Sequence, residues 1–149
     1  MAAVSSASAH WEGSLAEGSG TAVLESSGLG SFDVSWKART EGTTGTGLTS
    51  PEELVAAAHA SCFSMALSGS LARAGVPPTS LDTRAEVTFS QVEGGWGITA
   101  IALSVRGVVP GISAETFSEH AVGAKDGCPV SKALAAVPEI TVVSELLLG

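Results

Sequence analysis

The chain has 149 residues, of which 44% are apolar, and a formal net charge of −8 at pH 7. The apolar fraction argues against a disordered chain, and the seven Lys and Arg are scattered, so no basic patch is available to a nucleic acid. The length fits a single domain, which we predict over residues 1–149, and folds of this size often rely on a partner chain.

The first third of the chain predicts short strands separated by glycine-rich turns. The predicted strands are residues 10–15, 20–26 and 31–36, with turn signals between them. Residues 39–49 are too polar and too rich in glycine for a core element. We therefore expect that segment to be a loop that leads into a helix.

A long helix is predicted from Pro51 to about residue 74. Ser50 is a good N-cap, Pro51 suits the first helical position, and Glu53 completes a capping box. The residues that follow are apolar nearly all round, which is typical of a helix buried in the middle of a fold. Gly75 and the two prolines after it end the helix.

The rest of the chain predicts a hairpin, two helices and a closing strand. The predicted ranges are 80–92 and 96–109 for the hairpin strands, 113–125 and 128–137 for the helices, and 140–148 for the last strand. Strands, one long helix, a hairpin, two helices and a strand make an α+β layout without βαβ alternation.

The sequence also predicts where the protein resides. The longest apolar run is interrupted by His59, Ser61 and Ser64, so we expect a buried helix and no membrane partner. The first residues lack a basic region followed by an apolar core, which predicts a cytoplasmic protein. In a reducing cytosol a permanent disulfide is improbable, and paired thiols are more often catalytic or redox-sensing.

The two cysteines of the chain lie in different settings. Cys62 lies inside the apolar helix, and Cys128 directly precedes Pro129. Unpaired N–H groups at a helix start favour a thiolate, so local sequence predicts that Cys128 is the more acidic thiol. Cys62 would need a cation from elsewhere, for which Arg39 is the candidate. Glu52 could hold the Arg39 guanidinium in a bidentate ion pair.

Each of these residues also has a purely structural interpretation. A cysteine in an apolar helix is most often a core residue, Arg39 alone would be a surface residue, and Glu52 alone a solvated carboxylate. His59 lies one helical turn before Cys62, so it is either the base of a Cys–His nucleophile or a packed histidine. The histidines and cysteines lack zinc-site spacing, and no phosphate loop is present, so we expect no metal and no nucleotide.

Two segments resemble the OsmC/Ohr family. They are residues 49–67, TSPEELVAAAHASCFSMAL, and residues 127–134, GCPVSKAL. Residues 9–13, AHWEG, and 109–113, VPGIS, are similar to the OsmC branch of that family. The resemblance covers nearly the whole chain from Ala9 onward.

The resemblance implies an OsmC-like fold, with antiparallel sheets, a long buried central helix and an intertwined homodimer whose two active sites lie at the subunit interface. It implies a thiol peroxidase that reduces organic hydroperoxides and, more weakly, hydrogen peroxide. Cys62 matches the peroxidatic cysteine and Cys128 the resolving cysteine, while Arg39 and Glu52 match the arginine and glutamate of the site. The reductant of the family is a dithiol, typically a lipoylated protein, and no haem, flavin or metal is implied.

The resemblance reverses the local expectation of which thiol reacts first, and it leaves other functions open. Its physical account is that Arg39 and Glu52 activate Cys62 more than a helix end activates Cys128. The alternative function is a non-catalytic binding protein for a hydrophobic small molecule, with both cysteines in the core; a structural disulfide is a third reading. Phe63 and Met65 would either line the peroxidase site, where they would favour a substrate with an alkyl tail, or be plain core residues.

Overall fold

The structure is a computed structural model that describes residues 1–148. The chain forms two compact units, a first over Met1–Leu54 and a second that begins at Val55. The boundary between them falls inside the long helix α2, Pro51–Arg73. The single domain that we expect over residues 1–149 stays a prediction.

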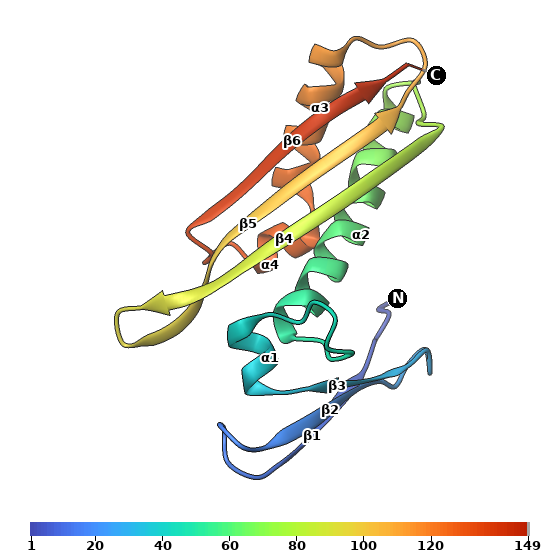
Figure 1. Ribbon diagram of the computed structural model, residues 1–149. Helices are drawn as coiled ribbons and strands as arrows, with labels where there is room; N and C mark the ends of the chain where they lie inside the picture. The colour runs from blue at the N-terminus through green and yellow to red at the C-terminus, as the bar shows by residue number, and fades with distance from the viewer. Residues whose placement is uncertain (149) are drawn as a thin grey trace. The chain divides into compact units, whose positions relative to one another are not determined.

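The first unit is built on a three-stranded antiparallel sheet. Its strands are β1 (Ala7–Glu12), β2 (Ser19–Leu24) and β3 (Ser31–Val34), in the order β1-β2-β3 (Figure 1). The three predicted strands are confirmed to within a few residues. The loop expected at residues 39–49 is wrong at its start, because the helix α1 occupies Trp36–Glu41. Ser35 begins this helix by accepting a hydrogen bond from the Ala38 N–H at 3.0 Å.

The second unit has a sheet in the order β4-β5-β6. Strand β4 (Ser80–Val92) pairs antiparallel with β5 (Gly95–Val108), which confirms the predicted hairpin. Strand β6 (Glu139–Leu147) pairs parallel with β5, so the expectation of purely antiparallel sheets is wrong for this pair. The reason is the crossover through the helices α3 (Ala114–Gly127) and α4 (Pro129–Ala133), which returns the chain to the start of the neighbouring strand.

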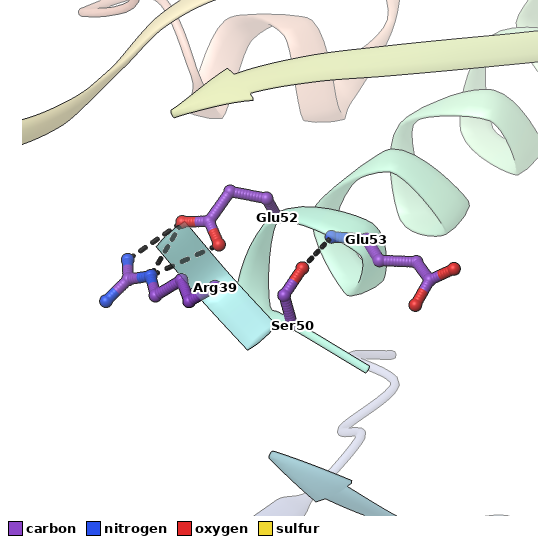
Figure 2. A network of polar contacts seen from close by, with 4 residues as sticks. All are labelled: Arg39, Ser50, Glu52 and Glu53. Atoms are coloured by element: carbon purple, nitrogen blue, oxygen red, sulfur yellow. Dashed lines mark hydrogen bonds and ion pairs between the residues drawn. The ribbon is translucent and has the colours of Figure 1, made fainter. Parts of the chain in front are cut away.

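Helix α2 begins as the sequence predicts. Ser50 Oγ accepts a hydrogen bond from the Glu53 N–H at 3.1 Å, and Pro51 opens the helix (Figure 2). The Glu53 carboxylate accepts a hydrogen bond from the Thr49 hydroxyl at 2.5 Å, which links Thr49 to the first turn of the helix. These contacts hold the first turn of the helix to the two residues that precede it.

The core of the second unit lies between its sheet and its helices. Helices α2 and α3 cover the same face of the β4-β5-β6 sheet (Figure 1). The fully buried side chains of this core include Phe63, Leu67 and Leu71 on α2 and Phe117 on α3. The spacing of four positions between the three α2 residues places them on one face of the helix.

The opposite face of α2 is exposed in the single chain. Met65 is 69% exposed, whereas Phe63 and Leu67 are fully buried. The long buried helix that we expect is therefore only half covered by its own chain. By length and composition alone α2 could cross a membrane, but the core helix of a soluble protein can have the same length and composition. The packed face of α2 belongs to the core of the second unit.

Candidate active site

The two cysteine sulfurs lie against each other in the second unit. Cys62 on α2 is half-buried, Cys128 is fully buried, and both are free thiols. Their Sγ atoms are 3.1 Å apart, within hydrogen-bonding distance. The structure therefore brings together two residues that are 66 positions apart in the sequence.

Local sequence fixes the place of Cys128. The residue closes α3, donating its N–H to the Ala124 carbonyl at 2.8 Å, and also stands at the start of α4. Pro129 supplies the first helical position of α4, where its missing N–H costs nothing. Because both helices hold its backbone, Cys128 has little freedom to move away from Cys62.

The two thiols have opposite shifts in acidity. Burial raises the pKa of Cys62, and the neighbouring Cys128 sulfur adds to that shift. Burial alone would also raise the pKa of Cys128, but it is lowered overall by the N–H groups of Ser131 and Val130, by the contact with Cys62 and by the Ser131 hydroxyl. These N–H groups favour the thiolate without forming a full capping hydrogen bond. Both directions agree with the expectation that Cys128 is the more acidic thiol.

Arg39 and Glu52 form a bidentate ion pair in the first unit. Arg39 Nε donates to both carboxylate oxygens at 3.0 and 3.1 Å, and Nη2 donates to Oε1 at 2.8 Å (Figure 2). The Glu52 side chain is 8% exposed and the Arg39 side chain 32%. The expected pairing of these two residues is present, and Arg39 is held on a helix and not in a loop.

An apolar pocket adjoins Arg39 within the first unit. It has a volume of about 340 Å³. Its lining consists of two tryptophans, two aliphatic side chains, a serine, a proline and the arginine: Trp11, Trp36, Leu15, Val34, Ser35, Pro51 and Arg39. The Trp36 ring also faces the guanidinium, with the centroid 5.9 Å from Cζ. A charged group beside apolar walls suits a ligand with one polar end and one apolar end.

Sequence reasoning missed a second polar contact at the cysteines. His59 is fully buried and its Nε2 lies 2.7 Å from Ser131 Oγ. Burial lowers the pKa of His59, and its Nδ1 has no hydrogen-bond partner among residues 1–148. Ser131 was not singled out, although its position three residues after Cys128, in the first turn of α4, was a signal that could have found it.

The structure assigns the two apolar residues beside Cys62 to different surroundings. Phe63 is a fully buried core residue. Met65 lies on the exposed face of α2, where it lines a shallow hollow with Ser64, Ser68 and Leu81. In the part of the chain that the structure describes, no group of three or more His, Cys, Asp or Glu side chains could hold a metal ion.

Known proteins are similar to this chain in sequence. The family "OsmC-like protein" matches residues 41–143. The chain is 49% identical over 138 residues to "Peroxiredoxin OsmC" of Escherichia coli (strain K12), covering 93% of both chains, and equally similar to the protein of the same name from Shigella flexneri.

Two solved structures extend the likeness to the fold. The organic hydroperoxide resistance protein OhrB of Bacillus subtilis has a TM-score of 0.69 and 26% identity, over 95% of this chain and 98% of that one. An organic hydroperoxide resistance protein from Elizabethkingia anophelis has a TM-score of 0.72 and 23% identity, over the whole of both chains. The predicted fold class, α+β and OsmC-like, is confirmed.

Proposed function

The chain belongs to the OsmC-like protein family and is a cysteine-based peroxidase, and on this basis we propose that Cys62 and Cys128 reduce organic hydroperoxides through a reversible disulfide. The observation that carries the proposal is the 3.1 Å separation of two free thiols. Bonded sulfurs are about 2 Å apart, so the two side chains need to close by only about 1 Å.

The first step takes place at Cys62. Its thiolate attacks the distal oxygen of the hydroperoxide, the O–O bond breaks, and an alcohol leaves after taking a proton. The sulfur becomes a sulfenic acid, the reversible first stage of thiol oxidation. Cys128 then condenses with it to a disulfide and releases water, and an outside dithiol restores both thiols by exchange. The chemistry of these steps requires no haem, flavin or metal.

Activation of Cys62 is the task that we assign to Arg39. In the single chain burial raises the pKa of Cys62, so its thiolate needs a positive charge from elsewhere. Arg39 carries that charge, and Glu52 fixes the plane of the guanidinium through two carboxylate oxygens. The same donor group would stabilise the charge that develops on the leaving oxygen.

We propose a homodimer as the active form. A single chain exposes apolar surface to water on one face of α2, where Met65 is 69% exposed, and at the side chain of Trp11. Exposed apolar surface of this kind often marks a protein–protein interface. A second copy of the chain that covers α2 would complete the buried central helix and place an active site at each subunit interface. Sedimentation velocity should give a dimer at micromolar concentration. A species that stays monomeric under these conditions contradicts this assignment.

The preferred substrate should carry an apolar tail. The pocket of about 340 Å³ beside Arg39 has walls of tryptophan, leucine and valine. An alkyl or aryl group would bury apolar surface there, whereas hydrogen peroxide has no apolar surface to bury. We therefore expect kcat/KM for cumene hydroperoxide to exceed that for hydrogen peroxide, and Trp36→Ala to narrow the difference.

The reductant and the location belong to the same proposal. A small dithiol or a lipoylated protein is the proposed electron donor, since its two thiols can open a disulfide by exchange. We propose a cytoplasmic location, where such donors are kept reduced. Turnover with lipoylated protein should exceed turnover with glutathione, and fractionation of cells should recover the protein in the cytoplasm.

Intact-protein mass spectrometry with thiol labelling is the experiment that tests the function. Reduced protein receives one equivalent of cumene hydroperoxide or of hydrogen peroxide before labelling. We expect loss of two labels and, after digestion, a peptide that links Cys62 to Cys128. Two thiols that stay labelled after both oxidants would contradict the role of these cysteines and favour a binding protein for a hydrophobic small molecule.

A further inference from the structure

A buried line of polar groups leads from α2 to Cys128. His59 and Cys128 are fully buried, and Ser131 is 8% exposed. His59 Nε2 lies 2.7 Å from Ser131 Oγ. The Ser131 hydroxyl also helps to lower the pKa of the Cys128 thiol. The chemistry described above uses neither His59 nor Ser131, although burying two polar side chains in a core costs free energy unless they are paired.

The two contacts repeat the same spacing on both segments. His59 and Cys62 are three positions apart on α2, and Cys128 and Ser131 are three positions apart at the start of α4. Residues at this spacing share one face of a helix. The 2.7 Å His59–Ser131 contact and the 3.1 Å contact between the sulfurs therefore join the same two segments side by side. The first contact fixes the register of the second.

The direction of the hydrogen bonds follows from the single proton of Ser131. Ser131 favours the Cys128 thiolate only when its hydroxyl donates to the sulfur. Its oxygen must then accept from His59, which places the hydrogen of the ring on Nε2. Burial lowers the pKa of His59 and keeps the ring neutral, so Nδ1 carries a lone pair, in agreement with its lack of a partner among the described residues.

We propose that His59 and Ser131 are positioning residues for the resolving step, which hold the Cys128 sulfur as a thiolate directed at Cys62. The inference rests on the proposed function, in which a hydroperoxide has already oxidised Cys62 to a sulfenic acid. The Cys128 thiolate attacks that sulfur: the S–S bond forms, the S–O bond breaks, and the leaving hydroxide becomes water by taking up the proton that the Cys128 thiol gave to solvent when it ionised. The Cys62 sulfur is reduced and the Cys128 sulfur is oxidised.

Other ionisable groups near α4 must be considered in any measurement of pH dependence. Lys125, Asp126 and Lys132 line a surface cavity of about 190 Å³ together with Ser131. Lys125 forms an ion pair with Asp126 at 3.2 Å, whose carboxylate is 68% exposed. On the other side, α2 contributes Cys62 and His59. Variants of Ser131 leave all five of these groups in place, so they isolate the effect of the hydroxyl.

The experiment is a single turnover with cumene hydroperoxide, in which peroxide consumption and disulfide formation are timed separately by quenching with a thiol label. In Ser131→Ala we expect disulfide formation to slow about tenfold relative to peroxide consumption at pH 7, and its pH midpoint to rise by about one unit. Ser131→Thr keeps the hydroxyl and should restore both values. His59→Leu should act like Ser131→Ala, while His59→Gln keeps a donor at the ε position and should resemble the parent.

A second serine–histidine pair in the same unit provides the matched control. Ser70 Oγ lies 2.8 Å from His120 Nδ1, and neither residue takes part in the cysteine contact. Ser70→Ala should change neither rate. Labelling of Cys128 across pH in the Cys62→Ser protein gives a second readout that needs no peroxide, and Ser131→Ala should raise its midpoint.

The outcomes separate this inference from the function on which it rests. If Ser131→Ala forms the disulfide at the parent rate and with the parent midpoint, the positioning role is overturned. If Ser131→Thr is as slow as Ser131→Ala, the serine acts through packing and the role is again overturned. A parent protein that consumes no peroxide contradicts the proposed function. The pH midpoint of Cys128 labelling would still show whether His59 and Ser131 favour the Cys128 thiolate.

Discussion

The two pairs of residues that we assign to the active site are built in opposite ways. Cys62 and Cys128 meet inside the second unit, where an apolar core surrounds them and one sulfur is fully buried. Arg39, in the last turn of α1, meets Glu52, in the first turn of α2, within the first unit, and the arginine side chain is 32% exposed. Burial holds the sulfurs in place but raises the pKa of Cys62, whereas the ion pair keeps its charge and lacks a nucleophile. Burial thus fixes the two thiols of the second unit, whereas a hydrogen-bonded ion pair fixes the positive charge of the first unit.

Removing the nucleophile should have the largest effect. Cys62→Ser leaves a hydroxyl where the thiolate attacks the peroxide, and we expect peroxide turnover to fall at least about 10³-fold. Peroxide consumption with a dithiol donor measures it. A Cys62→Ser protein that still turns over hydroperoxide would show that the sulfur pair is not the reactive one in this comparison.

Removing the resolving thiol should separate the two sulfurs. Cys128→Ser should consume one equivalent of hydroperoxide and then stop, because the sulfenic acid on Cys62 has no neighbouring thiol to condense with. Trapping with a sulfenic-acid reagent, followed by mass spectrometry, should find the label on Cys62. A Cys62 that stays free of this label after peroxide treatment would contradict its assignment as the thiol that reacts first.

Weakening the ion pair should come next. Arg39→Lys replaces a planar fork by a point charge, so the bidentate contact with Glu52 is lost while the charge remains. We expect kcat/KM for cumene hydroperoxide to fall about 10²-fold. Arg84→Lys is the matched control, because Arg84 pairs with Glu86 on an exposed surface and should leave the kinetics unchanged. Equal kinetics for both variants would remove Arg39 from the site.

The core behind the sulfurs gives a test of stability. A Cβ at Gly107 on β5 would lie 2.5 Å from the Phe117 ring and 3.0 Å from Leu81. Gly107→Ala should therefore lower the free energy of unfolding by about 1–3 kcal/mol. At Gly123 on α3 a Cβ would meet nothing within 4 Å, and Gly123→Ala should raise it by about 0.5–1 kcal/mol. Denaturant unfolding measures both, and a neutral Gly107→Ala would mean that α3 can move away from the sheet.

Sequence patterns predicted what is local in both regions. The N-cap at Ser50, the hairpin and the helix start at Cys128-Pro129 depend on neighbours in the chain, and the structure contains all three. The parallel pairing of β6 with β5 depends on which sheet edge receives a distant strand, and alternation does not encode that. The Cys62–Cys128 contact came from the family resemblance.

The sequence did not reveal a polar contact between side chains of the helices α2 and α4. The contact between His59 and Ser131 joins residues 72 positions apart, and although both lie in segments that resemble the family, nothing in either segment pairs them. Helix α1 was missed because glycine and threonine dominate the following segment and hide the short run that Ser35 caps. The exposed face of α2 was unexpected because an all-apolar helix looks fully buried in a sequence, whether its cover is its own chain or a second copy.

The smallest expected effect is the contribution of the buried His59 to the pH dependence of the free energy of unfolding. Burial lowers the pKa of His59, so the folded protein keeps the ring neutral at a pH where the unfolded chain, with a pKa of about 6.5, binds a proton. The contribution of the neutral His59 ring to the free energy of unfolding is complete above about pH 6.5. It is lost as the pH falls, by at most about 1.4 kcal/mol per pH unit.

Carboxylates titrate over part of the same range, so the informative quantity is a difference between variants. The loss of unfolding free energy between pH 7 and 5.5 should be smaller in His59→Leu than in the parent, because Leu has no proton to bind. His10→Gln is the control, since the His10 side chain is 76% exposed, and it should follow the parent. If His59→Leu loses as much stability as the parent over this range, the ring is protonated as easily in the folded protein as in the unfolded chain, and the neutral tautomer assigned to the His59–Ser131 contact is wrong.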